Sequence, residues 1–303
     1  MFTSKFLDQI AVGVAQKWIE RLFNPALVFW IGGILAFVSA HGAAPLITST
    51  QALDMPLHIA LAVGGLLVAV YGLMAMVKSV EFYALRILEG YWPGILQPLR
   101  SYFVKVQAKR QAGKRLEWER LAVRFVDLSS EERERYARLD ADLAAYPSRN
   151  RLLPTRLGNW LRAAEDYGWR RYGLATSVVW PRLWGVMPDT AKKEIVEARK
   201  RLDDAVGTFV YSVLFLAWTP WAWYWVVPSA FLGMLWAYGQ AIQSAGVYGE
   251  LLRAAFDLYR VLLYKALRWP LPLNPAEEEQ VGRRLTYFLQ RGSRGKTPYF
   301  IES

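Results

Sequence analysis

The sequence predicts an all-α protein that crosses a membrane four times, in two helical hairpins joined by a helical cytoplasmic region. Three observations lead to this prediction. Of the 303 residues, 54% are hydrophobic and 15% aromatic, which is high for a water-soluble chain. Four uncharged apolar runs are long enough to cross about 30 Å of hydrocarbon. All 37 lysine and arginine residues lie outside these runs and outside the short connectors that join them in pairs.

The composition also excludes several kinds of functional site. The chain has no cysteine and only two histidines, which excludes disulfide scaffolds, thiol nucleophiles, iron–sulfur clusters and thiolate zinc sites. We therefore expect no bound metal and no cofactor. The net charge of +11 is expected to attract anionic lipid headgroups or an anionic solute.

The chain is expected to begin with an interfacial helix and a first hairpin. Over residues 1–24 an apolar residue recurs every four positions, which is typical of an amphipathic helix lying at a membrane surface. A gating or lipid-sensing element is the alternative for this helix. Residues 25–77 hold the first hairpin, with spans at 25–46 and 57–77. We expect the first span to be retained, because the segment before it is too long and too amphipathic for a signal peptide.

Residues 78–204 are predicted to form a basic, mainly helical cytoplasmic region. A capping box at Ser129 and Glu132 indicates the start of one of its helices. The stretch Thr176–Trp184 is strand-like, although Pro181 argues against a central strand.

Residues 205–249 are predicted to form the second hairpin, with its tip at 225–228. Residues 250–303 are predicted to form a cytoplasmic helical extension and a tail. The last span continues as one long helix through Leu267, because the helical spacing of apolar residues does not stop at the end of the span, and a stiff connector begins at Pro270. A final helix is expected to begin at Asn274 and to end at Gly292, before a tail.

The distribution of basic residues gives the orientation. Loops rich in lysine and arginine stay on the cytoplasmic side, and all 37 such residues lie in 1–24, 78–204 and 250–303. Both termini are therefore expected in the cytoplasm.

The last span carries a row of small residues with a period of four. Its members are Ser229, Gly233, Ala237, Ala241, Ala245 and Gly249. In lipid, such rows let helix backbones approach closely and indicate packing faces. The sequence leaves two partners open, namely other spans of the same chain or a second subunit of a homo-oligomer.

Three polar side chains lie beside this row, on one face of the inner half of the same span. They are Gln240, Gln243 and Ser244. Because polar groups facing lipid are costly, they are expected either to line a water-filled path in a channel or to hydrogen-bond to neighbouring helices.

Arginines alternate with aromatic residues in the cytoplasmic region. The arginines are Arg149, Arg151, Arg156, Arg162, Arg170, Arg171 and Arg182. Guanidinium groups bind phosphate, so we expect them to contact anionic lipid headgroups or a phosphate-bearing ligand. The positive-inside bias accounts for most of them without nucleic acid, which we do not expect as a partner.

Enzyme signatures are absent from the sequence, including HExxH, GxSxG and GxGxxG. A membrane enzyme acting on a lipid-linked substrate would need clustered carboxylates or histidines near the inner interface, and no convincing set is recognisable. The spans also lack the central charged residues that ion-coupled transport requires. We therefore expect no catalytic residues.

Parts of the chain resemble bacterial multi-pass membrane proteins to which no activity is assigned. The resemblance rests on NRLLPTRLGNWLRAAEDYGWRRYG, VVWPRLW and LLRAAFDLYRVLLYKALRWPLP, and it transfers no site residue. In topology alone, two hairpins with inward helical extensions are similar to bestrophin-type anion channels, whose sequence motifs are absent.

The sequence therefore favours a homo-oligomeric passive channel, which a basic cytoplasmic vestibule would make selective for anions. The alternative is a non-conducting membrane scaffold or sensor subunit that recruits a cytoplasmic protein partner.

Overall fold

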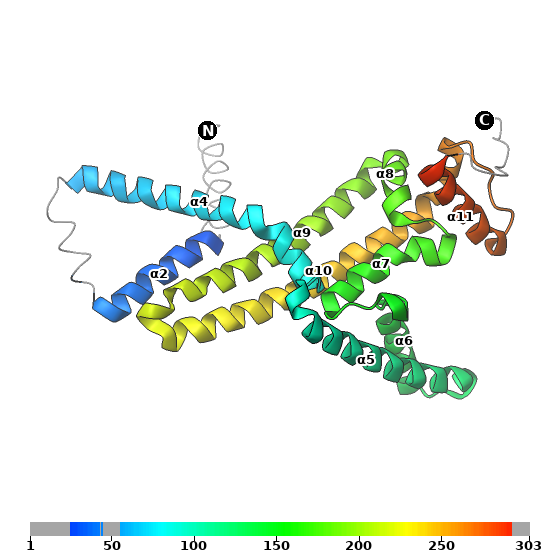
Figure 1. Cartoon of the computed structure of the whole chain (residues 1–303), viewed down its shortest axis with the longest axis horizontal. Helices are drawn as coiled ribbons and strands as arrows, with labels where there is room; N and C mark the ends of the chain where they lie inside the picture. The colour runs from blue at the N-terminus through cyan, green and yellow to red at the C-terminus, as the bar shows by residue number, and fades with distance from the viewer. Residues whose placement is uncertain (1–24, 43, 45–54, 293–303) are drawn as a thin grey trace, which may run out of the picture. The chain divides into compact units, whose positions relative to one another are not determined.

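The computed structural model describes residues 25–42, 44 and 55–292. Every described element is a helix, which confirms the all-α prediction (Figure 1). The predicted interfacial helix at 1–24 and the tail lie outside the described residues. The α-helices are α2 (Pro25–His41), α4 (Met55–Glu89), α5 (Gln97–Val123), α6 (Ser130–Ala144), α7 (Arg156–Tyr172), α8 (Thr176–Val186), α9 (Asp189–Leu214), α10 (Thr219–Ala266) and α11 (Pro275–Arg291). Short 3-10 helices are η1 (Gly94–Leu96), η2 (Phe125–Asp127), η3 (Arg149–Arg151) and η4 (Phe215–Trp218).

Local sequence signals set several helix ends as predicted. At the start of α6, the Ser129 hydroxyl accepts a hydrogen bond from the Glu132 backbone N–H, and the Glu132 carboxylate accepts one from the Ser129 N–H. At the start of α11, the Asn274 side chain accepts from the Glu277 N–H at 2.9 Å. Gly292, with φ of +71°, ends α11. These caps are confirmed.

The strand-like stretch Thr176–Trp184 is instead part of helix α8, so that interpretation was wrong. The Ala175 carbonyl accepts from two backbone N–H groups, of Val178 and Val179, at 2.9 Å each, which starts the helix. Burial decides the outcome, because Val179 and Leu183 lie on one helical face with 0% exposure. A proline inside so short a helix removes only one backbone hydrogen bond.

The described chain divides into two compact units. One comprises the chain up to Ala84 together with Asp204–Gly239, and we call it the apolar unit. The other comprises Leu85–Asp203 together with the chain from Gln240 onward, and we call it the charged unit. The chain passes from one unit to the other three times, each time inside a continuous helix, in α4, α9 and α10.

The apolar unit packs α2 against the turn between α9 and α10. Gly32 and Gly33 allow this, because a Cβ at these positions would lie 2.3 Å from the Phe215 ring and 2.5 Å from the Trp218 ring. The Trp218 indole N–H donates to the Phe29 carbonyl at 3.1 Å. Side chains larger than hydrogen at these two positions would separate the helices.

The turn of the second hairpin lies earlier in the chain than its predicted tip at 225–228, which was wrong. The turn is η4, and α10 begins at Thr219 and continues through Pro228. Thr219 followed by Pro220 is the stronger signal for a helix start, because proline in a first helical turn sacrifices no hydrogen bond. The backbone of Ala222 is non-helical, with φ of −153° and ψ of 54°, and it kinks this first turn.

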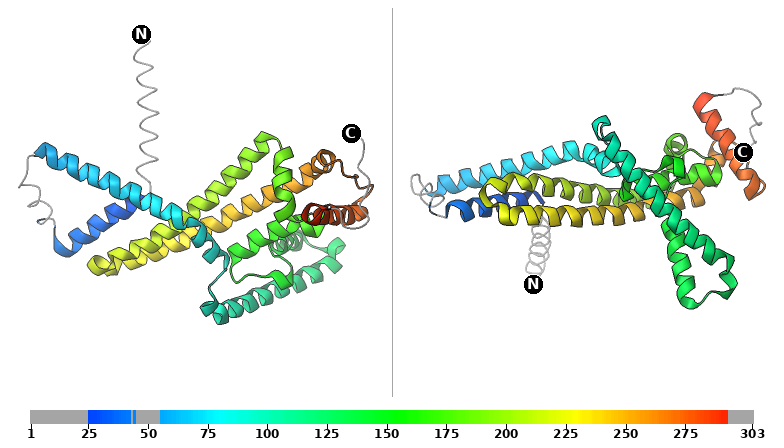
Figure 2. Two further views of the ribbon diagram at one scale, coloured as in Figure 1. Left: turned by 45° about the horizontal axis from the view of Figure 1, so that its top comes forward. Right: turned by 60° about the horizontal axis from the view of Figure 1, so that its bottom comes forward.

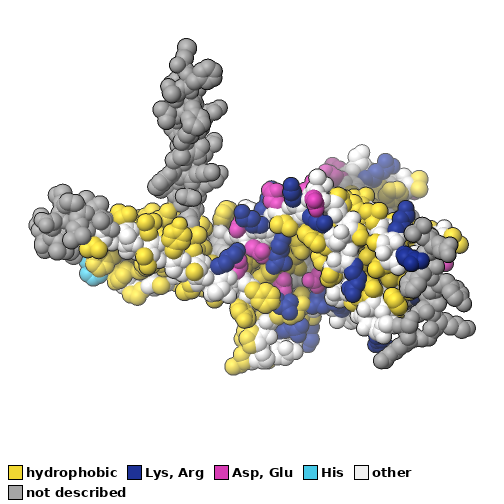
Figure 3. Space-filling view, turned by 90° about the horizontal axis from the view of Figure 1, so that it is seen from above, with side chains coloured by type: hydrophobic (Ala, Val, Ile, Leu, Met, Phe, Trp, Pro, Cys, Tyr) yellow, Lys and Arg dark blue, Asp and Glu magenta, His cyan; other side chains and the backbone are white. Residues whose placement is uncertain are grey.

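Two helical segments of the described chain are long and apolar enough to cross a membrane, Leu61–Val123 and Asp189–Ala266. The second segment contains α9, η4 and α10, and α2 is a shorter apolar helix of 17 residues. Helix α4 has apolar side chains on its surface, since Val68 and Tyr71 are 74% and 68% exposed. Figure 3 shows hydrophobic side chains gathered over the apolar unit, with charged ones gathered elsewhere. Association with a membrane follows from this surface.

The charged unit has a core formed by α7, α8, α9, α10 and α11. Its largest fully buried side chains include Tyr264, Phe256 and Leu285. The Thr286 hydroxyl fixes α11 to the turn between α7 and α8, because it donates to the Gly173 carbonyl and accepts from the Ala175 N–H. Helices α5 and α6 lie side by side as a hairpin (Figure 2).

Candidate functional site

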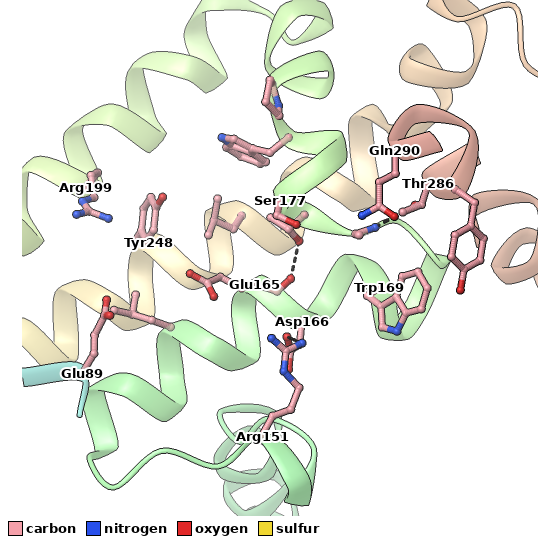
Figure 4. Close-up of a pocket in the computed structure, with 17 residues that line it drawn as sticks. Glu89, Arg151, Glu165, Asp166, Trp169, Ser177, Arg199, Tyr248, Thr286 and Gln290 are labelled. Carbon is pink, nitrogen blue, oxygen red and sulfur yellow. Dashed lines mark hydrogen bonds and ion pairs between the residues drawn. The ribbon is translucent and has the colours of Figure 1, made fainter. Parts of the chain in front are cut away.

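A cavity of about 600 Å³ opens in the charged unit (Figure 4). Its walls come from α4, η3, α7, α8, α9, α10 and α11. The polar side chains that matter most for its chemistry are Glu89, Glu165, Asp166, Ser177, Arg199 and Tyr248. Its volume suits a small ligand. Three of its helices, α4, α9 and α10, are the same helices that continue into the apolar unit.

Glu89 is the last residue of α4, and close packing holds it in place. Helix α7 crosses the end of α4 at Gly158, where a Cβ would lie 1.9 Å from the Glu89 carbonyl oxygen. Arg86, one turn earlier, pairs with the Glu89 carboxylate at 3.3 Å. Burial nevertheless raises the pKa of Glu89, because lost hydration outweighs the attraction of Arg86.

Glu165 and Asp166 are neighbours on α7 with different surroundings. Asp166 is 4% exposed and forms an ion pair with Arg151. Glu165 is exposed to the cavity and makes no ion pair among the described residues. Lost hydration raises the pKa of both carboxyls, and Asp166 adds to the rise at Glu165 while Arg162 opposes it. Glu165 is thus the carboxylate that a ligand would meet.

Arg199 and Tyr248 form the wall contributed by α9 and α10. The Arg199 guanidinium pairs with Asp203, one turn along α9, at 3.0 Å. It also lies 5.9 Å from the centre of the Tyr248 ring. In Figure 4 the side chains of Arg199 and Tyr248 point toward the same space as those of Glu89 and Glu165. The cavity therefore presents both signs of charge.

Helix α8 supplies hydrogen-bonding groups to the cavity. The Thr176 hydroxyl donates to the Glu165 carbonyl and ties α8 to α7. Pro181 has no N–H, so the carbonyl of Ser177 lacks its partner within the helix. Both Ser177 and Pro181 line the cavity. The polar residue Ser177 thus lines the wall together with Trp169 and Trp180.

This arrangement fits binding better than metal chemistry. The described residues contain no group of three or more His, Asp or Glu side chains that could hold a metal ion. The arginines of the cavity have acidic partners of their own, which leaves the Glu165 carboxylate as its one unmatched charge among the described residues. A ligand with a cationic or hydrogen-bond-donating group and a flat face would match the carboxylate and the rings.

The predicted arginines do not converge on one place. Of the seven predicted arginines, Arg151 alone lines the cavity described above. Arg149 and Arg170 line a second cavity in the same unit. The others contact neighbouring groups: Arg156 lies over Trp160, Arg162 donates to Tyr91, Arg171 donates to Tyr172, and Arg182 donates to the Val178 carbonyl.

The small-residue row is buried inside the chain. Ala237, Ala241 and Ala245 are 0%, 0% and 1% exposed. A Cβ at Gly233 would lie 2.6 Å from the Ser212 hydroxyl of α9, and one at Gly249 would lie 3.2 Å from Ala164 of α7. Within the row, Ser229 at its N-terminal end is exposed and Gly233 is half-buried. The central part of this row is therefore not free to contact a second subunit.

The three polar residues of α10 differ in exposure. Gln243 is exposed, whereas Gln240 and Ser244 are half-buried. None of the three makes a side-chain hydrogen bond to another described residue. Their amides and hydroxyl are consequently open to water or to groups outside the described chain.

Sequence reasoning missed Glu89, Glu165, Arg199 and Tyr248. Each belongs to a helix with ordinary surface charges, and only the folding of α4, α7, α9 and α10 around one space brings them together. One sequence feature could have indicated the site: the two carboxylates Glu165 and Asp166 directly follow two alanines, which are buried on α7. Such a pair is also common on solvated helix faces.

The chain matches no protein-family model, no curated protein and no solved structure.

Proposed function

We propose that this chain is a four-span bacterial plasma-membrane protein that binds a small polar ligand in its cytoplasmic charged unit. The spans are α2, the apolar part of α4, and the two arms of the α9–η4–α10 hairpin. Positive-inside bias supports cytoplasmic termini and a cytoplasmic charged unit. The protein would act as a membrane-bound sensor, with a cytoplasmic protein partner as the receiver of its signal.

One observation carries this proposal. The cavity is lined by Glu89 of α4, Arg199 of α9 and Tyr248 of α10, and each of these helices continues without interruption into the apolar unit. A ligand that contacts all three would bias their positions, and continuous helices transmit such shifts over several turns. A cavity built only from α7, α8 and α11 would offer no such connection.

The ligand class follows from the walls. Glu165 would receive a cationic or donating group, Trp169 and Trp180 would contact a flat or apolar face, and the hydroxyls of α8 would bind further polar atoms. Small amines, amino sugars and neutral sugars carry these groups in different proportions.

The test uses three probes, putrescine, glucosamine and glucose, with the full chain in detergent. We expect at least one to raise the melting temperature of the wild type, and Glu165→Gln to abolish that rise. Glu194→Gln, at an exposed position of α9 outside the cavity, is the matched control and should keep it. The absence of any shift in the wild type, or equal shifts in both variants, would refute the proposal.

A second candidate function is a homo-oligomeric passive pore, anion-favouring because of the basic cytoplasmic side. The supporting observation is Gln243, an exposed amide without a hydrogen bond, between Trp236 and Val247, which are 61% and 53% exposed. This alternative places the part of α10 around Gln243 inside the bilayer, where an amide facing lipid is costly, and a water-filled path would remove that cost. Since the small-residue row is buried, subunits would have to meet through this exposed face instead.

Flux across liposomes tests the pore. Gln243→Glu adds a fixed negative charge at the proposed path and should reduce anion flux several-fold, by electrostatic repulsion. Gln97→Glu, which adds the same charge on α5, should not. No wild-type flux above that of empty liposomes would eliminate this function.

A further inference from the structure

A second cavity of about 720 Å³ lies in the charged unit, beside the α5–α6 hairpin. Its walls are formed by α5, α6, the segment that leads into η3, and Arg170 of α7. It shares no lining residue with the cavity described above. The proposed sensor function makes no use of it.

Positive charge dominates this second cavity. Three arginines, Arg115, Arg149 and Arg170, line it, against a single carboxylate, Asp140. Arg149 makes no ion pair with a described residue and is exposed. Arg115 pairs with Glu119 at 3.0 Å, but both are largely exposed to solvent, where such pairs are weak.

Arg170 is held in a position that leaves part of its guanidinium group available. One nitrogen donates to the Tyr146 carbonyl at 3.5 Å, and this carbonyl lies beside the cavity. Asp166 lies within electrostatic range of Arg170, but its direct partner is Arg151. The remaining N–H groups of Arg170 are therefore not committed to a carboxylate.

Two neutral side chains of the cavity, Trp118 and Gln111, are held by contacts with their neighbours. The Trp118 indole ring lines the cavity, and its N–H is buried without a hydrogen-bond acceptor. The ring is fixed by stacking on Tyr136, with centroids 5.5 Å apart. The Gln111 amide N–H donates to the Pro147 carbonyl at 3.2 Å, which holds the segment leading to η3 against α5. These contacts fix the Trp118 ring and the segment leading to η3 beside the arginines.

We propose that this second cavity binds the phosphate group of a small phosphate-bearing molecule. Guanidinium forks match phosphate oxygens in geometry as well as in charge, and Arg149 and Arg170 reach the cavity from separate elements. The size of the cavity exceeds that of a phosphate ion, which leaves room beside Trp118 for the rest of the molecule. The phosphate source is either a soluble metabolite or a lipid headgroup.

The test measures binding of inorganic pyrophosphate to the full chain in phosphatidylcholine nanodiscs by isothermal titration calorimetry. We expect binding that weakens as salt rises, and a Kd at least tenfold higher in Arg149→Glu. Arg133→Glu is the matched control, because Arg133 is an exposed arginine of α6 that makes no ion pair with a described residue and lies outside the cavity. Arg170→Gln should weaken binding as well.

A second arm distinguishes the sources. If phosphatidylglycerol in the nanodisc competes with pyrophosphate in the wild type and equally in Arg133→Glu, the ligand is a lipid headgroup, and if it competes in neither, the ligand is soluble. Either result supports the phosphate site. No pyrophosphate binding by the wild type, or the same loss in Arg133→Glu as in Arg149→Glu, would overturn it. These outcomes are independent of the Glu165 experiment.

Discussion

At the scale of single residues, Glu165 is placed at an electrostatic cost. Its neighbour Asp166 has Arg151 as a direct partner, whereas Glu165 has no ion pair among the described residues. The walls of the cavity remove part of its hydration, which raises the pKa of this carboxyl above its usual value of 4.5. A group that the folded state holds in an unfavourable environment is a frequent mark of a functional site.

This cost predicts a pH-dependent effect of Glu165→Gln. A raised pKa means that the folded state binds the proton more tightly than the unfolded state, so wild-type stability falls as pH rises from 4.5 to the raised pKa. Because the glutamine variant lacks this loss, its melting temperature should exceed that of the wild type at pH 8. The two should converge at pH 4.

Thermal unfolding at both pH values, without ligand, gives the measurement. Glu194→Gln should differ from the wild type by the same small amount at pH 4 and pH 8. A Glu165→Gln variant less stable than the wild type at pH 8 would mean that the carboxylate is paired in the folded state, contrary to the geometry.

At the scale of elements, the joint between α7, α8 and α11 controls the position of the cavity wall. Gly173 ends α7 with φ of +68°, and a Cβ there would lie 2.2 Å from the Glu279 carbonyl oxygen of α11. Gly292 ends α11 with a similar φ of +71°, but a Cβ there meets no atom of a described residue within 4 Å. Substitutions at these two glycines therefore distinguish the cost of backbone strain from the cost of a steric clash.

We expect Gly173→Ala to destabilise the protein by more than Gly292→Ala. Gly173→Ala incurs the left-handed penalty, about 1–2 kcal/mol, and it also forces α11 away from α7, which costs a further 1–3 kcal/mol, roughly. Gly292→Ala incurs a backbone penalty alone, because the combination of φ +71° and ψ −167° suits only glycine. Chemical denaturation in detergent measures the difference. Equal losses would show that α11 adapts to the added methyl group without cost.

The elements themselves were largely predictable, and the failures have clear causes. Caps at Ser129 and Asn274 involve residues three positions apart, so the sequence contains the whole interaction. Helix α8 was misread because its core contacts come from distant elements and override its β-branched composition. The cavity could not be predicted, since Glu89 and Tyr248 are far apart in the chain and meet only through tertiary packing.

At the scale of the whole molecule, topology is the property that most needs an experiment, and the composition makes it accessible. The sequence contains no cysteine, so single substitutions can be labelled without background. Thr50→Cys and Trp223→Cys should react with a membrane-impermeant maleimide in intact cells, because both lie outside in the four-span arrangement. Lys105→Cys and Lys200→Cys should react only after permeabilisation.

The second hairpin is the decisive case. If Trp223→Cys is protected in intact cells and labelled after permeabilisation, α9 and α10 do not cross the membrane, and the four-span arrangement fails. Labelling of Thr50→Cys in the same cells confirms that the reagent reaches the outer surface.

The chain connects its two units three times, and this restricts both how the protein could have evolved and how it can be divided into fragments. Each unit is assembled from two separate stretches of sequence, so no single cut releases the charged unit, and no simple gene fusion could have added it to an existing anchor. An insertion or deletion of one residue within α4, α9 or α10 rotates everything beyond it by about 100°. The linking helices should therefore tolerate substitutions far better than changes in length, and related chains should be conserved in the spacing across these junctions.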